Sequence, residues 1–149
     1  MKKALFILFS ICLIFSCDNS TNPTPPKTNI EIWQSHSTGN YNYYFRNSCF
    51  CFGAFIGPFH IFIKNNAIDS VFNFYDSSVV VDSLYDNMKI KTIEQYFTWI
   101  DSQLASQPFR DTIFYNPILG YPQYAYFDYN QMLADEEYGF IIDSLIIIK

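Results

Sequence analysis

The sequence predicts an α+β fold, in which an antiparallel sheet packs on one long amphipathic helix plus a short N-terminal helix. Two observations support this prediction. Several segments alternate side chains with the period of two that is typical of a half-buried strand. Residues 92–104 instead repeat apolar side chains at helical spacing. Strand segments that are separate in sequence from one long helix are typical of a sheet with helices on one face.

Both helices have recognisable starts. The short one covers residues 29–36, with Asn29 as its N-cap. The long one follows Thr92, where Gln95 completes a capping box, and Pro108 stops it. In each helix, a set of side chains recurs on one side. These sets are Ile30, Trp33 and Ser37 in the short helix, and Ile93, Tyr96, Phe97, Ile100 and Leu104 in the long one.

Strands are predicted on both sides of the long helix in sequence. The first strand starts at Tyr41, where the period-two pattern begins. Residues 76–89 give a mixed signal, which indicates a loop with a short apolar contact. The last strand has largely apolar side chains on both faces, which indicates a central position or cover on both sides. This last strand covers 138–148, and the other strand segments are a hairpin over 59–74 and single strands over 110–116 and 122–129.

The hairpin has a specific turn and register. Asn65 and Asn66 can adopt the positive φ angles that a two-residue turn requires. A regular ladder around that turn predicts the pairs Ile63–Ile68, Ile61–Ser70 and Phe59–Phe72.

The first sixteen residues are set apart from the fold. Lys2 and Lys3 precede an apolar run that is shorter than the roughly 20 residues of a spanning helix, and this layout is typical of a secretory signal. The run ends in "IFSC", which resembles a bacterial lipoprotein signal, with Ile14 three positions before Cys17 and Ser16 just before it. The resemblance implies cleavage before Cys17, a diacylglycerol thioether on its sulfur and an acyl chain on its new amino group. The alternative is a plain signal peptide with an incidental cysteine.

Three parts are therefore expected along the chain: a lipoprotein signal peptide (1–16), a lipidated cysteine with a Pro-rich tether (17–29), and a single α+β domain (30–149). Pro-rich segments act as semi-rigid spacers, so the tether would hold the domain away from the lipid. Several acyl chains on one cysteine anchor a protein firmly. We expect a membrane-anchored lipoprotein of the bacterial cell envelope, facing the periplasm or the cell surface, with the choice of membrane left open.

Charge and composition exclude one class of function. Removal of the signal leaves 7 basic against 14 acidic side chains, and a formal charge of −7. Proteins that bind nucleic acid neutralise phosphates with basic side chains, so no nucleic acid partner is expected. The 16 Phe and 12 Tyr residues suggest a sugar-binding platform, but an AT-rich genome explains the same abundance more simply.

The stretch "CFC" holds the cysteines that remain after lipidation, Cys49 and Cys51. An oxidising compartment favours a disulfide between them. Residues two apart in a strand lie roughly 6.6 Å apart, near the upper limit for an unstrained bridge, and a bulge near Gly53 would bring them closer. Redox exchange, a soft-metal site and unpaired or intermolecular thiols are the alternatives. Exchange would require a depressed thiol pKa, and Arg46 points to the opposite face by parity.

Other chemistry has little support in the sequence. We expect no catalytic residues, no metal site and no cofactor, and therefore no enzyme. A hydrolase would need a pocket that joins His60 with Asp128 or with the acidic turn at 135–137. The segment from Asp128 begins like a calcium loop, but Met132 stands where an oxygen ligand is required.

Four motifs follow one another along the chain: the C-x-C of Cys49 and Cys51, a helix with "YFTWI", the G-Y-P at 120–122 with Asp128, and the final "ADEEYGFII". This order resembles the bacterial lipoprotein family of domain of unknown function 6174. That family often has Asp where this chain has Asn116. The resemblance implies a small envelope lipoprotein and no particular activity.

The function expected from the sequence is a lipid-anchored, non-catalytic binding or scaffold module. Its partners would be membrane lipid, through acylated Cys17, and an envelope protein that docks on one sheet face or edge. The alternative is a thiol-redox or soft-metal-binding envelope protein that uses Cys49 and Cys51.

Overall fold

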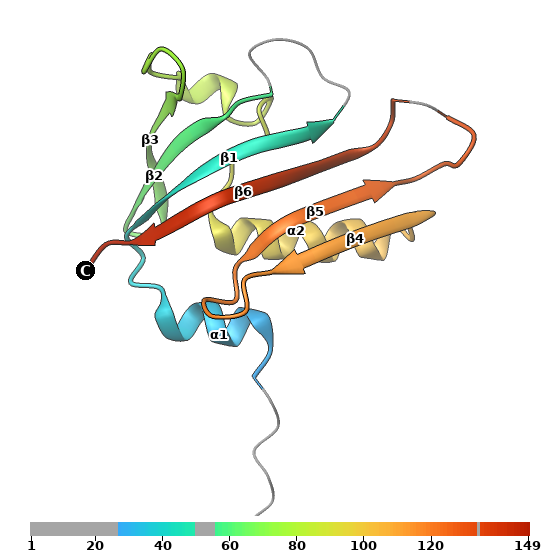
Figure 1. The fold of residues 1–149 in the computed structure, drawn as a ribbon, viewed down its shortest axis with the longest axis horizontal. Helices are drawn as coiled ribbons and strands as arrows, with labels where there is room; N and C mark the ends of the chain where they lie inside the picture. The colour runs from blue at the N-terminus through green and yellow to red at the C-terminus, as the bar shows by residue number, and fades with distance from the viewer. Residues whose placement is uncertain (1–26, 50–55, 134) are drawn as a thin grey trace, which may run out of the picture.

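The computed structural model describes residues 27–49, 56–133 and 135–149. These residues form one six-stranded antiparallel sheet with the strand order β3-β2-β1-β6-β5-β4 (Figure 1). The strands are β1 (Tyr41–Cys49), β2 (Phe59–Lys64), β3 (Ala67–Asn73), β4 (Arg110–Tyr115), β5 (Pro122–Asp128) and β6 (Tyr138–Ile147). The helices are α1 (Asn29–His36) and α2 (Ile93–Ala105), with a single 3₁₀ turn, η2 (Asp82–Leu84), between β3 and α2.

The predicted fold class is wrong, because no long helix supports the sheet in the described part of the chain. Helix α2 has 13 residues and α1 has 8, and the six strands together hold about twice as many residues as these two helices. The end of α2 explains part of the difference. Gln107 takes a left-handed φ of 54°, which ends the helix before Pro108, and Leu104 is 40% exposed instead of continuing the buried stripe. The chain is mostly antiparallel sheet, with two short helices.

The starts of the two helices follow the same rule. Thr92 caps α2 and Gln95 completes the capping box, as the sequence predicts. For α1 the predicted cap is wrong by one residue: Thr28 is the N-cap, and its side chain and Glu31 form a second capping box. Asn29 is the first helical residue.

The hairpin of β2 and β3 has the predicted turn and a partly different register. Asn65 and Asn66 have φ angles of 52° and 61°, as a two-residue turn requires. The pair Ile63–Ile68 is confirmed, but a bulge between Phe62 and Ile63 shifts the other predicted pairs by one residue. The structure therefore pairs Ile61 with Val71, His60 with Phe72 and Phe59 with Asn73.

Strand β6 lies between β1 and β5, which confirms the central position expected from its apolar faces. Strand β5 follows a tight turn. The side-chain oxygen of Asn116 accepts hydrogen bonds from the backbone N–H groups of Ile118 and Leu119, at 3.0 and 2.8 Å. Gly120, at φ +77°, closes the turn against α1: a Cβ there would lie 2.3 Å from the carbonyl oxygen of Asn29. This turn sets where α1 packs.

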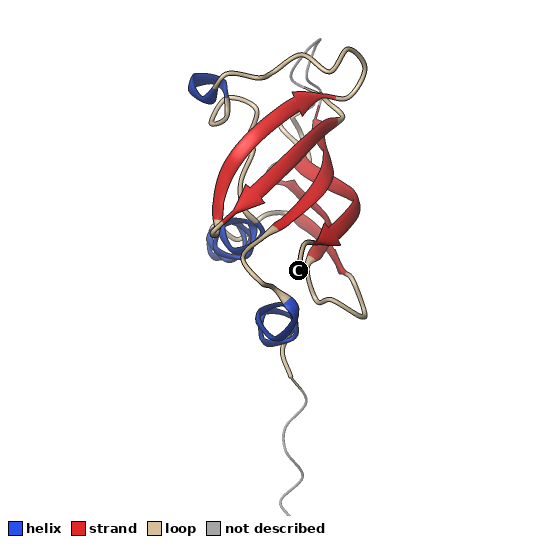
Figure 2. Cartoon of the chain, turned by 90° about the vertical axis from the view of Figure 1, so that its left-hand side faces the viewer, coloured by secondary structure: helices blue, strands red, loops and turns tan. Residues whose placement is uncertain are grey.

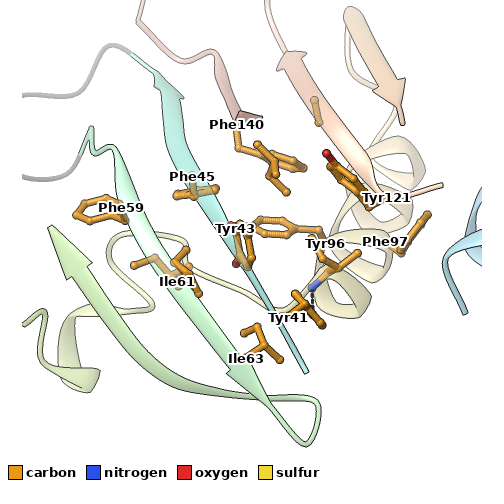
Figure 3. Close-up of a cluster of buried hydrophobic side chains, with 14 of the residues drawn as sticks. Tyr41, Tyr43, Phe45, Phe59, Ile61, Ile63, Tyr96, Phe97, Tyr121 and Phe140 are labelled. Atoms are coloured by element: carbon orange, nitrogen blue, oxygen red, sulfur yellow. Dashed lines mark hydrogen bonds between the residues drawn. The ribbon is translucent and has the colours of Figure 1, made fainter. Parts of the chain in front are cut away.

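The core lies on one face of the sheet, which we call the inner face (Figure 3). Alternate residues of β1 and β2 are buried there, and α2 adds its apolar stripe. Aromatic rings fill much of the space: the ring of Tyr96 lies 4.3 Å from that of Phe140 and 5.6 Å from that of Phe45. The labelled side chains of this cluster are Tyr41, Tyr43, Phe45, Phe59, Ile61, Ile63, Tyr96, Phe97, Tyr121 and Phe140.

Buried hydroxyl and amide groups form hydrogen bonds with the loop that leads into α2. The hydroxyl of Tyr96 donates to the carbonyl of Lys89 at 3.0 Å, and the hydroxyl of Tyr43 donates to the carbonyl of Lys91. The side-chain amide of Asn47 donates to the carbonyl of Met88 at 2.9 Å. These three bonds, which we call the loop latch, give the carbonyls of Met88, Lys89 and Lys91 side-chain donors, and the bond to Met88 is fully buried.

Helix α1 is attached through a second polar group. The carboxylate of Glu94 accepts from Trp33 Nε1 at 2.7 Å and from the Tyr41 hydroxyl at 3.0 Å. The Tyr41 oxygen in turn accepts the backbone N–H of Ile93 at 2.9 Å. Trp33 is fully buried, and its ring meets that of Tyr41 edge-on at 5.1 Å. The first turn of α2 thus connects α1 to the sheet.

Candidate functional site

The second face of the sheet, which we call the outer face, has no helix over it among the described residues. Helix α2 lies behind the sheet in Figure 1, and the side view in Figure 2 shows the same arrangement. The outer face nevertheless bears large side chains, because several strand residues between the buried positions, among them Tyr44, His60 and Phe62, carry aromatic rings. Such a face is a candidate binding surface.

Aromatic rings on this face touch one another across three strands and the segment that follows them. His60 is the centre: its ring stacks on Tyr44 at 4.2 Å and lies 4.2 Å from Phe62. The chain of contacts continues from Phe62 to Phe72 at 5.8 Å, and from Tyr44 to Phe74 at 5.6 Å. We call this set the aromatic row; its members are Phe72, Phe62, His60, Tyr44, Phe74 and Tyr75.

Within the row, His60 behaves as a packing residue. Its Nε2 lies 3.0 Å from the side-chain oxygen of Asn42, and its ring is covered by Tyr44 and Phe62. Burial lowers the pKa of His60 below its ordinary value, which favours the neutral ring at neutral pH. A neutral imidazole donates through Nε2 to Asn42 and stacks as an aromatic ring.

At one end of the row the surface forms a hollow of about 340 Å³. An ion pair forms part of its wall: Arg46 donates to Asp143 through Nε at 2.9 Å and through Nη2 at 2.7 Å. Hydrogen bonding to Asp143 raises the pKa of Arg46, so the guanidinium stays cationic. We call this site the aromatic hollow; its lining residues are Tyr44, Arg46, Pro58, Phe74, Tyr75 and Asp143.

The aromatic hollow combines flat apolar surface with two charged groups that are fixed in position. Phe74 is 53% exposed and Tyr75 is 79% exposed, although both are large rings. Arg46 and Asp143 come from neighbouring central strands, and each leaves about two fifths of its side chain exposed. Ligand sites are commonly built from apolar walls with a few oriented polar groups. The aromatic hollow therefore has the composition of a site that recognises a ligand.

The cysteines of the sequence analysis are only partly placed. Cys17 and Cys51 lie outside the described residues, so lipidation and the Cys49–Cys51 pairing stay predictions. Cys49 is the last residue of β1 and lies opposite Tyr138 of β6. The parity argument for Arg46 is supported, because its side chain is on the outer face while Asn47 is buried on the inner one.

The structure keeps apart His60 and Asp128, one of the two combinations that a hydrolase would need. His60 lies on β2 and Asp128 at the end of β5, and β1 and β6 run between these strands. Three strand spacings correspond to about 14 Å. Within the described ranges, no group of three or more His, Cys, Asp and Glu side chains is close enough to hold a metal ion.

The fold and the hollow together define a small single-sheet domain with one covered and one open face. Comparison with known families identifies it further. Residues 26–147 match a family of unknown function, DUF6174, and the chain belongs to this family. No curated protein and no solved structure matches the chain significantly. In the part of the chain that the structure describes, no helix is long and apolar enough to cross a membrane.

Proposed function

We propose that this protein is a lipid-anchored, non-catalytic binding module of the bacterial cell envelope, and that the outer face of its sheet is the binding surface. The observation that carries the proposal is the row of aromatic side chains on a face that no described helix covers. Exposed aromatic residues are costly to leave in water and are enriched where proteins meet their ligands.

The lipid anchor in this proposal is supported by the sequence of the N-terminus. The short apolar run, the small Ser16 and the Pro-rich stretch after Cys17 are the arrangement of a lipoprotein signal and its tether. Such an anchor leaves the domain at a short distance from the lipid, with the outer face available to other envelope components.

The anchor is tested by metabolic labelling with an alkyne analogue of palmitate in a bacterial host. Wild type should be labelled and should sediment with membranes, whereas Cys17→Ser should lose the label. Cys12→Ser is the matched control, since Cys12 lies in the segment expected to be removed, and it should keep the label. A label that survives Cys17→Ser would contradict the anchor.

The binding surface is tested by sedimentation of the purified full chain with envelope fragments stripped of lipid by detergent. Wild type should co-sediment, and Tyr75→Ala should reduce the bound fraction at least fivefold. Phe114→Ala is the matched control, because Phe114 is a 60% exposed ring on edge strand β4, remote from the hollow in strand order. Equal retention of wild type and Tyr75→Ala would show that the hollow is not the binding surface.

A further inference from the structure

The ligand class follows from the lining of the aromatic hollow. We propose that this hollow binds one ring of a neutral oligosaccharide, with the sugar stacked on the face of Tyr75, its edge against Phe74, and its hydroxyl groups bonded to Arg46 and Asp143. This inference rests on the proposed function, because it names the ligand of the same surface.

The aromatic walls match the apolar side of a sugar ring. A pyranose ring presents C–H groups on its faces, and their hydrogens carry partial positive charge. The face of an aromatic ring carries partial negative charge, so the two surfaces attract each other. The planes of Tyr44 and Phe74 meet at 82°, and those of Phe74 and Tyr75 at 78°. Successive rings therefore stand nearly at right angles and form the sides of a hollow instead of a flat stack.

The polar groups match the edge of the same ring. Hydroxyl groups both donate and accept, and the hollow offers a donor and an acceptor side by side. The ion pair uses two of the five N–H groups of Arg46, and each carboxylate oxygen of Asp143 accepts one of those bonds. Further N–H groups and lone pairs remain for a ligand on side chains that are 43% and 42% exposed. Hydrogen bonds to such charged groups are stronger than those between neutral groups.

Charge favours a neutral sugar over an anionic ligand. The positive charge of Arg46 is balanced by Asp143 at 2.7 Å, so the hollow has no net charge to attract a phosphate or carboxylate. The chain as a whole is acidic, with a net charge of −5, and repels anions.

Position in the sheet argues against an extended peptide as the ligand. A peptide that adds to a sheet needs an edge strand with unpaired backbone groups. Strand β1, which supplies Tyr44 and Arg46, is paired with β2 on one side and with β6 on the other. Recognition here therefore depends on side chains alone. The volume of about 340 Å³ is at the lower end of ligand sites, which fits a short part of a glycan chain.

Isothermal titration of the full chain tests this inference. The protein is kept in a zwitterionic detergent without a sugar headgroup, and the probes are cellohexaose, chitohexaose, maltohexaose and laminarihexaose. At least one hexasaccharide should bind with a Kd below about 1 mM. Tyr75→Ala and Arg46→Met should each weaken that binding at least tenfold, whereas Phe114→Ala should change it less than twofold.

Folding is checked in the same samples. Tyr75 and Phe114 are both exposed, so both variants should keep the thermal midpoint of wild type within about 2 °C. A second probe is a synthetic peptide of residues 18–28, because aromatic grooves also bind proline-rich chains. Binding of this peptide more tightly than any sugar would overturn the inference.

Two other results would also overturn it. One is the absence of binding to all four sugars at 10 mM; the other is equal weakening by Tyr75→Ala and Phe114→Ala, which would indicate nonspecific adhesion to aromatic surface. If envelope sedimentation still depends on Tyr75 while no sugar binds, the proposed function stands and the ligand class is wrong. If sedimentation does not depend on Tyr75, the surface itself is wrong.

Discussion

Removal of one hydroxyl group, in Tyr96→Phe, tests whether the loop latch stabilises the domain. The ring of Tyr96 is 1% exposed and packs against Phe45 and Phe140, and these contacts remain in the variant. The change removes the 3.0 Å bond to the carbonyl of Lys89. The carbonyl of Lys89 then loses its side-chain donor at a partly buried position.

The expected loss follows from this geometry. The bond is partly buried, so water can reach part of the site, and the expected loss is the roughly 0.5–1.5 kcal/mol typical of one intramolecular hydrogen bond. No cavity of side-chain size forms, so the packing contribution is small. In urea, with a slope of about 1–3 kcal/mol per molar, a loss of about 1 kcal/mol lowers the unfolding midpoint by roughly 0.5 M.

Equilibrium unfolding followed by far-UV circular dichroism measures this loss. Tyr124→Phe is the matched control, since the Tyr124 hydroxyl makes no hydrogen bond within the described residues, and it should stay within about 0.5 kcal/mol of wild type. Equal midpoints for Tyr96→Phe and Tyr124→Phe, at unchanged slope, would refute the stabilising role of the latch.

Three further predictions concern other parts of the chain. Gly120→Ala should lower the thermal midpoint far more than Gly39→Ala. Both glycines have φ +77°, but the new Cβ meets the backbone of α1 at Gly120 and only a side chain at Gly39. Similar losses of stability in the two variants would contradict the contact with α1. Burial lowers the pKa of His60 in the folded state below its unfolded value of about 6.5. The neutral ring therefore contributes fully to the stability of the fold above pH 6.5, and this stability is lost as the pH falls towards the lower folded pKa. His60→Gln should therefore lose less stability than wild type between pH 7.5 and 5.5, and equal losses would exclude His60 as a cause. Intact mass after alkylation, with and without reduction, should reveal a reducible pair at Cys49 and Cys51; full alkylation without reduction would exclude it.

Short sequence patterns, such as turn and capping residues, predicted most of the helices and strands. The turn at Asn65 and the capping box at Thr92 depend only on neighbouring residues, and both predictions are confirmed. The cap of α1 was predictable in the same way, because Thr28 followed by Glu31 three residues later is a capping-box pattern. The prediction of Asn29 as the N-cap did not take this capping box into account.

The aromatic hollow could not be assembled from the sequence. Its ion pair joins Arg46 of β1 to Asp143 of β6, which are neighbours only because of the strand order. The hairpin register failed for a related reason: a bulge between Phe62 and Ile63 has no marker in an alternating pattern. One available signal was missed, since Tyr44 and Arg46 are large side chains at positions expected to face away from the core.

The pairing of β1 with β6 also decides when the domain can fold. Tyr41 pairs with Ile147, so the centre of the sheet joins residues about a hundred positions apart. Contacts of such long sequence separation slow folding, because a large loop must close before they form. A chain that emerges N-terminus first, from a ribosome or through a translocation channel, exposes the aromatic β1 long before its partner arrives. The sheet can therefore close only after β6 has emerged, and until then the unpaired aromatic strand β1 is prone to aggregation.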